Sequence, residues 1–192
     1  MKYLRTRITE VLTPAPNYKL LRFAGDEPIP ARPGEFVMVR GEWGVHPVLP
    51  RAFSLVECGE FGSIIVKPIG EGTELLAGME VGDELTVFGP LGKGYHMDAA
   101  DSNNAGRRPI LVAGGVGVAP LLYLAREVHA AGTRSVCIYG GRTEDDLPLA
   151  EDIAEVAELV VTTENGGRGE QGRVTAPLER LLAEDSNAIV YS

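Results

Sequence analysis

A glycine-rich turn between residues 110 and 120 limits the possible folds of this chain more than any other segment. Residues 110–113 are an apolar run typical of a buried strand, the turn Gly114-Gly115-Val116-Gly117 follows, and Pro120 stands at the start of an amphipathic run over 119–131. Closely spaced glycines between a strand and a helix let backbone N–H groups approach a phosphate. A tight turn that only packs strand against helix is the alternative, and the sequence leaves both open.

The residues around and beyond this turn alternate between strand and helix patterns. The pattern predicts strands at 109–113, 135–139, 159–163 and 188–191, and helices at 119–131, 146–158 and 175–183. Gly132 is expected to end the first helix, and Thr175 to cap the last. Alternation of this kind demands a parallel sheet with helical crossovers, so residues 109–192 are predicted to form a doubly wound nucleotide-binding domain.

The first half of the chain has short strand patterns punctuated by glycine and proline. Strands are predicted at 3–12, 18–23, 35–40, 51–56, 63–68 and 84–88, and a helical turn at 73–79 with Thr73 as its cap. Such spacing favours a small antiparallel barrel over residues 1–98. The polar stretch 99–108 has no apolar periodicity and is predicted to be a linker.

Composition excludes several classes of partner and site. A net charge of -9 argues against sequence-independent binding to nucleic acid or to an anionic membrane surface, and no apolar run is long enough to span a bilayer. Cys58 and Cys137 are too few for an iron–sulfur cluster and are expected to be small buried hydrophobes in a reducing, cytoplasmic setting. His46, His96 and His129 lack metal-ligand spacing.

The strand predicted at 51–56 opens with Arg51-Ala52-Phe53-Ser54. In an alternating strand Arg51 and Phe53 share one face, and Ala52 and Ser54 the other. An aromatic ring beside a guanidinium suits a flat ring system joined to a diphosphate. By itself such a segment is more often an ordinary edge strand.

Further candidate phosphate contacts follow two other predicted strands. Ile65-Val66-Lys67 leads to Gly72 and Thr73, which can offer N–H groups and a hydroxyl to a phosphate, although Thr73 can also serve only as a cap. After the strand at 135–139 the chain continues Gly140-Gly141-Arg142. Arg142 can meet a nucleotide phosphate or remain a solvated loop charge.

Taken in order, these motifs, with Gly89-Pro90-Leu91-Gly92 and the run 162–175, resemble the ferredoxin–NAD(P)H reductase superfamily, and within it the electron-transfer subunits of dihydroorotate dehydrogenase B. The resemblance implies an FAD-binding barrel followed by an NAD(P)-binding domain. It assigns the FAD diphosphate to Arg51, the flavin ring to Phe53 and the flavin edge to Ser54. It assigns further contacts to Ile65, Val66, Lys67, Gly72 and Thr73, and the nicotinamide nucleotide to Gly114 to Pro120; Ala52 stands where many members have proline.

The same resemblance implies hydride transfer between NAD(H) and FAD by positioning, with no catalytic side chain. Electrons would then pass singly through a [2Fe–2S] cluster to an FMN-containing catalytic subunit in a heterotetramer that oxidises dihydroorotate for pyrimidine biosynthesis. Members continue past a strand such as 188–191 into a Cys-Gly-Pro turn, and dihydroorotate subunits add a cysteine-rich tail for the cluster. Those ligands do not occur in this sequence, so we expect an α/β domain truncated at its C-terminus.

Three questions stay open at this point. A reductase subunit of the sulfide dehydrogenase or NADPH-dependent ferredoxin reductase type is an alternative, as is a flavin-binding fragment without catalysis. FMN would also fit Arg51 and Thr73. NADPH is not excluded, because Arg142 and Arg168 can each reach a 2′-phosphate.

Overall fold

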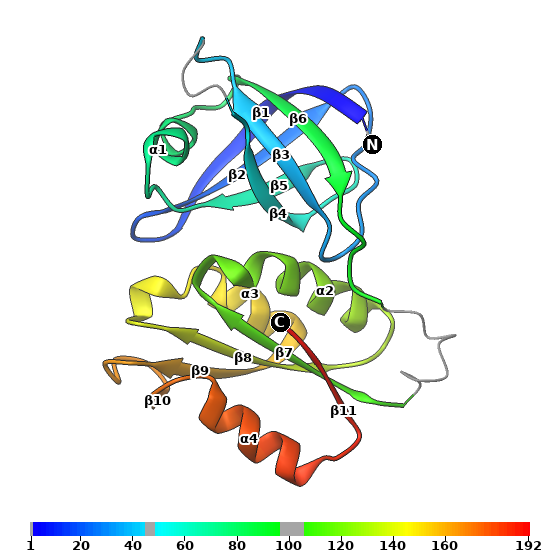
Figure 1. Cartoon of the computed structure of the whole chain (residues 1–192), viewed down its shortest axis with the longest axis vertical. Helices are drawn as coiled ribbons and strands as arrows, with labels where there is room; N and C mark the ends of the chain where they lie inside the picture. The colour runs from blue at the N-terminus through cyan, green and yellow to red at the C-terminus, as the bar shows by residue number, and fades with distance from the viewer. Residues whose placement is uncertain (1, 45–48, 97–105) are drawn as a thin grey trace. The chain divides into compact units, whose positions relative to one another are not determined.

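The computed structural model describes residues 2–44, 49–96 and 106–192, which divide into two compact units, residues 1–94 and 95–192. The first unit is a closed barrel with strand order β1-β2-β5-β4-β3-β6, in which every strand pair is antiparallel, and a short helix α1 accompanies it (Figure 1). Its elements are β1 (Lys2–Ala15), β2 (Tyr18–Gly25), β3 (Phe36–Gly41), β4 (Arg51–Glu57), β5 (Gly62–Val66), α1 (Glu71–Ala77) and β6 (Glu84–Leu91).

Alternating side chains fill the barrel and form its core. In β3, Val37 and Val39 are completely buried while Phe36, Met38 and Arg40 beside them are partly exposed, as the two-residue period of a strand requires. Phe23, Leu55 and Ile64 from three other strands complete the centre of this core. The predicted antiparallel barrel is confirmed.

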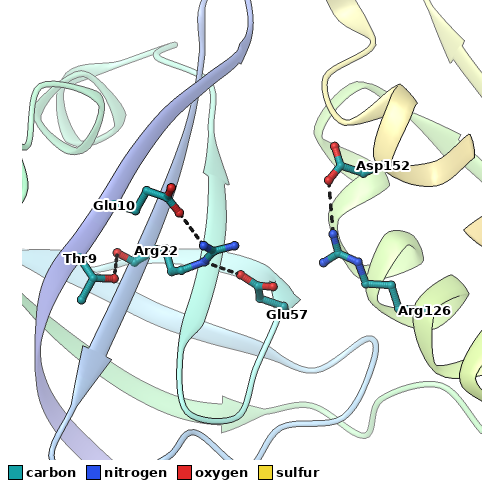
Figure 2. Close-up of polar contacts among 6 residues, drawn as sticks. All are labelled: Thr9, Glu10, Arg22, Glu57, Arg126 and Asp152. Atoms are coloured by element: carbon teal, nitrogen blue, oxygen red, sulfur yellow. Dashed lines mark hydrogen bonds and ion pairs between the residues drawn. The ribbon is translucent and has the colours of Figure 1, made fainter. Parts of the chain in front are cut away.

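A cluster of ion pairs joins three strands of the barrel (Figure 2). Arg22 on β2 donates to Glu57 Oε1 at 2.8 Å and to Glu10 Oε2 at 2.5 Å. The hydrogen bond to Glu57 raises the pKa of Arg22 above its ordinary value, against the opposing effect of burial, and the charge of Glu10 adds to the increase. Because Glu57 ends β4, this cluster fixes the strand that begins with Arg51.

The second unit is a parallel sheet with order β10-β9-β8-β7-β11. Helices α2 and α3 cover one face and α4 covers the other (Figure 1), and Arg126 of α2 pairs with Asp152 of α3 at 3.3 Å (Figure 2). The elements are β7 (Arg108–Gly114), η1 (Gly115–Gly117), α2 (Val118–Ala130), β8 (Ser135–Gly141), η2 (Glu144–Asp146), α3 (Ala150–Val156), β9 (Ala157–Thr163), β10 (Glu170–Gln171), α4 (Thr175–Glu184) and β11 (Ala188–Tyr191). The predicted doubly wound fold is confirmed.

The helix expected at 146–158 was wrong in its bounds. The segment instead holds the short turn η2 and the two-turn helix α3, and β9 begins at Ala157. Pro148 lies between the two helical pieces, and Leu149 has a left-handed φ of 61° that no α-helix contains. The two-residue strand β10 was not predicted, because its two polar residues carry no strand pattern.

Two expected helix caps were also wrong by position. Helix α1 begins at Glu71 after Gly70, so Thr73 is its third residue, and Thr175 is the first residue of α4, after Val174. Gly132 does follow the end of α2 with a positive φ of 82°, as expected of a residue that terminates a helix. The predicted linker at 99–108 lies largely outside the described residues, and His46 lies wholly outside them. None of the helices within the described ranges is long and apolar enough to cross a membrane.

The two cysteines differ in environment. Cys137 in β8 is completely buried, as predicted, whereas Cys58 lies just after β4, is half-buried, and places its Sγ 2.9 Å from the carbonyl oxygen of Ala31. Burial raises the pKa of the Cys137 thiol to about 12, from an ordinary value of 9.0.

This shift predicts a specific loss of stability in alkali. Below pH 9.0 the Cys137 thiol is protonated in both the folded and the unfolded chain. As the pH rises toward 12 only the unfolded chain releases the proton, so the free energy of unfolding falls by up to about 1.4 kcal/mol per pH unit. We expect Cys137→Ala to lose stability less steeply than the wild type above pH 9.0 in urea unfolding, and parallel pH profiles would contradict this.

Candidate cofactor-binding sites

In the barrel unit, the guanidinium of Arg51 lies against the backbone of Gly72. A Cβ at Gly72 would stand 2.8 Å from Nε and 3.0 Å from Cζ of Arg51, so the close approach requires glycine. Arg51 Nη1 donates to the carbonyl oxygen of Leu49 at 2.5 Å. Within residues 2–44 and 49–96 no carboxylate pairs with Arg51. Among these residues the structure thus presents a guanidinium without a carboxylate partner beside bare backbone, an arrangement that suits a phosphate.

The pairing register confirms which residues of β4 share a face. Phe53 stands opposite the fully buried Val37 of β3, so Phe53 and Arg51 face the inside of the barrel wall, and Ala52 and Ser54 face outward. Phe53 is only partly buried and packs on the edge of the barrel core. A partly buried aromatic ring therefore lies on the same face as the guanidinium.

Thr73 uses its hydroxyl to close the turn that carries Gly72. Its Oγ1 accepts from the N–H of Ile69 at 2.9 Å and of Gly70 at 3.2 Å, and donates to the Gly70 carbonyl at 2.9 Å. The Thr73 N–H also donates to that carbonyl, at 2.9 Å. Thr73 thus acts in the structure as a brace for the turn.

The three predicted contacts on the next strand have little exposed side-chain surface. Ile65 and Val66 are buried, and Lys67 Nζ donates to the hydroxyl of Tyr18 at 2.9 Å. The same ammonium lies 4.8 Å from the centre of the Tyr18 ring. Any contact of Ile65 or Val66 with a ligand therefore falls to the backbone.

Replacement of Gly72 tests this contact without breaking the fold. Alanine fits the helical backbone and is favoured there over glycine by about 1 kcal/mol, but its Cβ must push the flexible Arg51 guanidinium aside. We expect Gly72→Ala to keep or raise the thermal midpoint while FAD affinity, measured by titration, falls about tenfold. Equal affinity in the two proteins would show that the position of Arg51 is irrelevant.

In the second unit the glycine turn lies where the strand order reverses. From β7 the chain adds β8 and β9 on one side of the sheet and β11 on the other, so the carboxyl end of β7 is the switch point at which such sheets bind ligands. Gly115 has a positive φ of 51°, and a Cβ at Gly117 would meet nothing within 4 Å. Gly114 is exposed, Val116 is 45% exposed, and Pro120 occupies the first turn of α2.

A buried hydroxyl that the sequence patterns did not identify supports this turn. Tyr139 of β8 is completely buried, and its hydroxyl oxygen lies 3.0 Å from the Gly115 carbonyl oxygen and 2.9 Å from that of Pro148. No sequence pattern marked this hydroxyl, because a tyrosine in an apolar strand resembles any core aromatic.

Each of three arginines after β8 and β9 is paired with a carboxylate. Arg142 Nε lies 3.4 Å from Asp146, and Arg168 Nη2 lies 2.6 Å from Glu151. A third, wider pair joins Arg173 Nε to Glu164 at 4.0 Å. No spacing motif pairs these acids with the arginines, so the sequence did not indicate the ion pairs. In the described part of the chain, no group of three or more His, Cys, Asp or Glu side chains is arranged to hold a metal ion.

Comparison with known proteins agrees with both halves of this arrangement. Residues 111–192 match the family model for the oxidoreductase NAD-binding domain. The electron transfer subunit of dihydroorotate dehydrogenase B (NAD(+)) from Bacillus caldolyticus is 38% identical over 156 residues, which are 80% of this chain and 60% of that protein. The chain thus spans about 60% of the length of the curated relatives it matches.

Two solved structures share the fold of the whole chain. The ferredoxin reductase in carbazole 1,9a-dioxygenase aligns with a TM-score of 0.81 and 21% identity, over 95% of this chain and 58% of that one. An NADH-dependent reduced ferredoxin-NADP oxidoreductase aligns with a TM-score of 0.78 and 25% identity, over 94% of this chain and 64% of that one. Residues 111–192 therefore form an oxidoreductase NAD-binding domain, and the chain as a whole is similar to the NAD(P)H-linked flavin oxidoreductases of the ferredoxin reductase-like superfamily.

Proposed function

We propose that this chain passes electrons between NAD(H) and a partner redox subunit through FAD, in the oxidation of dihydroorotate for pyrimidine biosynthesis. One observation carries the FAD assignment: the Arg51 guanidinium lies, without a carboxylate among the described residues, against the backbone of Gly72. A ligand with adjacent phosphates supplies the negative charge that this guanidinium lacks among the described residues.

The residues present fit FAD in the barrel unit. Arg51 would hold the diphosphate beside Gly72, Phe53 would lie along the flavin ring, and Ser54 would stand near its edge. Bound FAD supplies exchange of a hydride with NAD(H) and release of its electrons one at a time. The chain's own contribution is to bind and orient both nucleotides, and no side chain is assigned as a catalytic acid or base.

In the second unit, the glycine turn from Gly114 to Gly117 and the start of α2 at Pro120 would hold the pyrophosphate of the nicotinamide nucleotide. The backbone at Gly117 is accessible, because a Cβ there would have no atom of the described residues within 4 Å. Arg142, which directly follows β8, would lie beside the adenosine ribose.

The carboxylates around the three arginines favour NAD(H) over NADP(H). Asp146, Glu151 and Glu164 already neutralise the cations that a 2′-phosphate would need. Glu144 and Asp145 add further negative charge beside Asp146 in the turn η2. A phosphate dianion would have to displace an ion pair and face the released acid, whereas a ribose hydroxyl can donate to a carboxylate.

The dihydroorotate assignment rests on the relatives, which are named as electron transfer subunits. We propose accordingly an FMN-containing catalytic subunit as partner in a heterotetramer. The residues of this chain do not fit a [2Fe–2S] cluster, because its only cysteines, Cys58 and Cys137, belong to different units and Cys137 is completely buried. A reductase that serves a different acceptor is the second candidate, favoured by the 25% identical ferredoxin-NADP oxidoreductase.

Anaerobic reduction tests this function. FAD is added to the purified protein, excess FAD is removed, and the flavin absorbance is followed as NADH and, separately, NADPH is added. We expect NADH to bleach the bound flavin, and NADPH to do so at least about tenfold more slowly at equal concentration. A protein that retains no FAD, or retained FAD that NADH leaves oxidised, would refute the proposal.

A further inference from the structure

Tyr139 connects two parts of the second unit that lie far apart in the sequence. Its hydroxyl lies 3.0 Å from the Gly115 carbonyl oxygen and 2.9 Å from the Pro148 carbonyl oxygen. Carbonyl oxygens only accept, so the hydroxyl is the donor and its single proton serves both partners. The side chain therefore ties the glycine turn after β7 to the segment before α3.

The bond to Gly115 fixes the direction of the next N–H group. A trans peptide is planar, and its C=O and N–H point in opposite directions. The Gly115 carbonyl faces the buried Tyr139 hydroxyl and also accepts from the Val118 N–H. The Val116 N–H, in the same peptide unit, must then point away from the buried Tyr139 hydroxyl, and Val116 itself is 45% exposed.

This peptide unit needs such a restraint, because glycine does not restrain it. Gly115 has a φ of 51°, and glycine passes between backbone conformations at little cost. On the other side of Tyr139, Leu149 is buried and holds a left-handed φ of 61°, which surrounding contacts must maintain in a residue of this type. The hydroxyl thus links the peptide after Gly115, where glycine permits several conformations, to the segment at Leu149, whose conformation is held by surrounding contacts.

We propose that Tyr139 is a positioning residue for dinucleotide binding, whose hydroxyl holds the Gly115–Val116 peptide so that the Val116 N–H faces the pyrophosphate. The inference rests on the proposed function, because it assigns the glycine turn to a nicotinamide dinucleotide. Tyr139 itself does not touch the ligand, since its side chain is completely buried.

The test removes only the hydroxyl. Tyr139→Phe is titrated calorimetrically with ADP-ribose, which carries the pyrophosphate but undergoes no redox reaction, at a temperature at which the variant is fully folded by near-UV circular dichroism. We expect its Kd for ADP-ribose to rise about fivefold, the worth of one hydrogen bond, and FAD affinity to stay unchanged. Ser135→Ala is the control: it deletes a fully buried hydroxyl at the opposite end of β8 and should leave both affinities unchanged.

The outcomes distinguish a failure of the positioning role of Tyr139 from a failure of the proposed function. A wild-type protein that binds no ADP-ribose defeats the proposed function. If the wild type and Tyr139→Phe bind ADP-ribose equally well, Tyr139 has no positioning role, even if the variant has a lower thermal midpoint. Should the variant not fold, nuclear magnetic resonance of the wild type decides: the Val116 amide signal must shift among the most strongly on adding ADP-ribose, and an unmoved signal overturns the inference.

Discussion

Arg51→Ala is expected to lower the affinity for FAD about 100-fold while leaving the barrel folded. The guanidinium lies against Gly72 and, among the described residues, lacks a carboxylate, so its removal deletes a charge-assisted contact to the diphosphate and breaks no ion pair. Such a contact is worth roughly 3 kcal/mol when the ligand excludes water from it. Fluorescence titration of FAD into the apoprotein measures the loss, and the thermal midpoint reports the fold.

Arg5→Ala supplies the matched control for charge. Arg5 is exposed on β1 of the same barrel, so its removal changes the net charge equally. We expect it to leave FAD affinity unchanged. Arg51→Lys should recover only part of the affinity, because an ammonium cannot form the paired hydrogen bonds of a guanidinium. If Arg5→Ala weakens FAD as much as Arg51→Ala does, the effect is one of net charge and the assigned contact is wrong.

Gly117→Val is expected to abolish measurable NADH binding without a cost in stability. Gly117 has an ordinary φ of -63°, which valine adopts, and a Cβ there would meet nothing within 4 Å. The added methyl groups would therefore stand in the space through which a phosphate reaches the backbone N–H groups. Loss of those contacts corresponds to about 100-fold or more in Kd.

Graded variants make this result specific. Gly117→Ala should weaken ADP-ribose binding less than Gly117→Val, since the obstruction grows with side-chain size, and both should retain FAD in the barrel unit. The thermal midpoints should match the wild type within a few degrees, because surface changes of this kind cost little. Undiminished ADP-ribose binding by Gly117→Val would place the pyrophosphate elsewhere.

Local pattern was sufficient to predict the architecture. Barrel strands such as β3 alternate between buried and partly exposed residues, and the second half alternates between strand and helix, so the two-unit fold followed from periodicity. The prediction of one helix at 146–158 was wrong. The helical spacing of apolar residues continues through Pro148 and Leu149, but the helical backbone is interrupted there. Tertiary contacts around Leu149 hold a conformation that local propensity disfavours.

The candidate site was predictable only in part. Gly72 and Arg51 were identified separately, but their contact depends on how the barrel closes and not on the spacing of the two residues. Thr73 was assigned to a cap, whereas it braces the turn from the third helical position. The roles of Asp146 and Tyr139 were not predicted, because they arise from partners that the fold brings near these residues.

Comparison of FAD with riboflavin tests most directly whether Arg51 and the Gly72 turn clasp a diphosphate. Riboflavin has the same ring system and no phosphate. The contact predicts that the apoprotein binds FAD at least about 100-fold more tightly than riboflavin, and that Arg51→Ala removes most of this difference. Equal affinity of the wild-type protein for FAD and riboflavin would contradict the account.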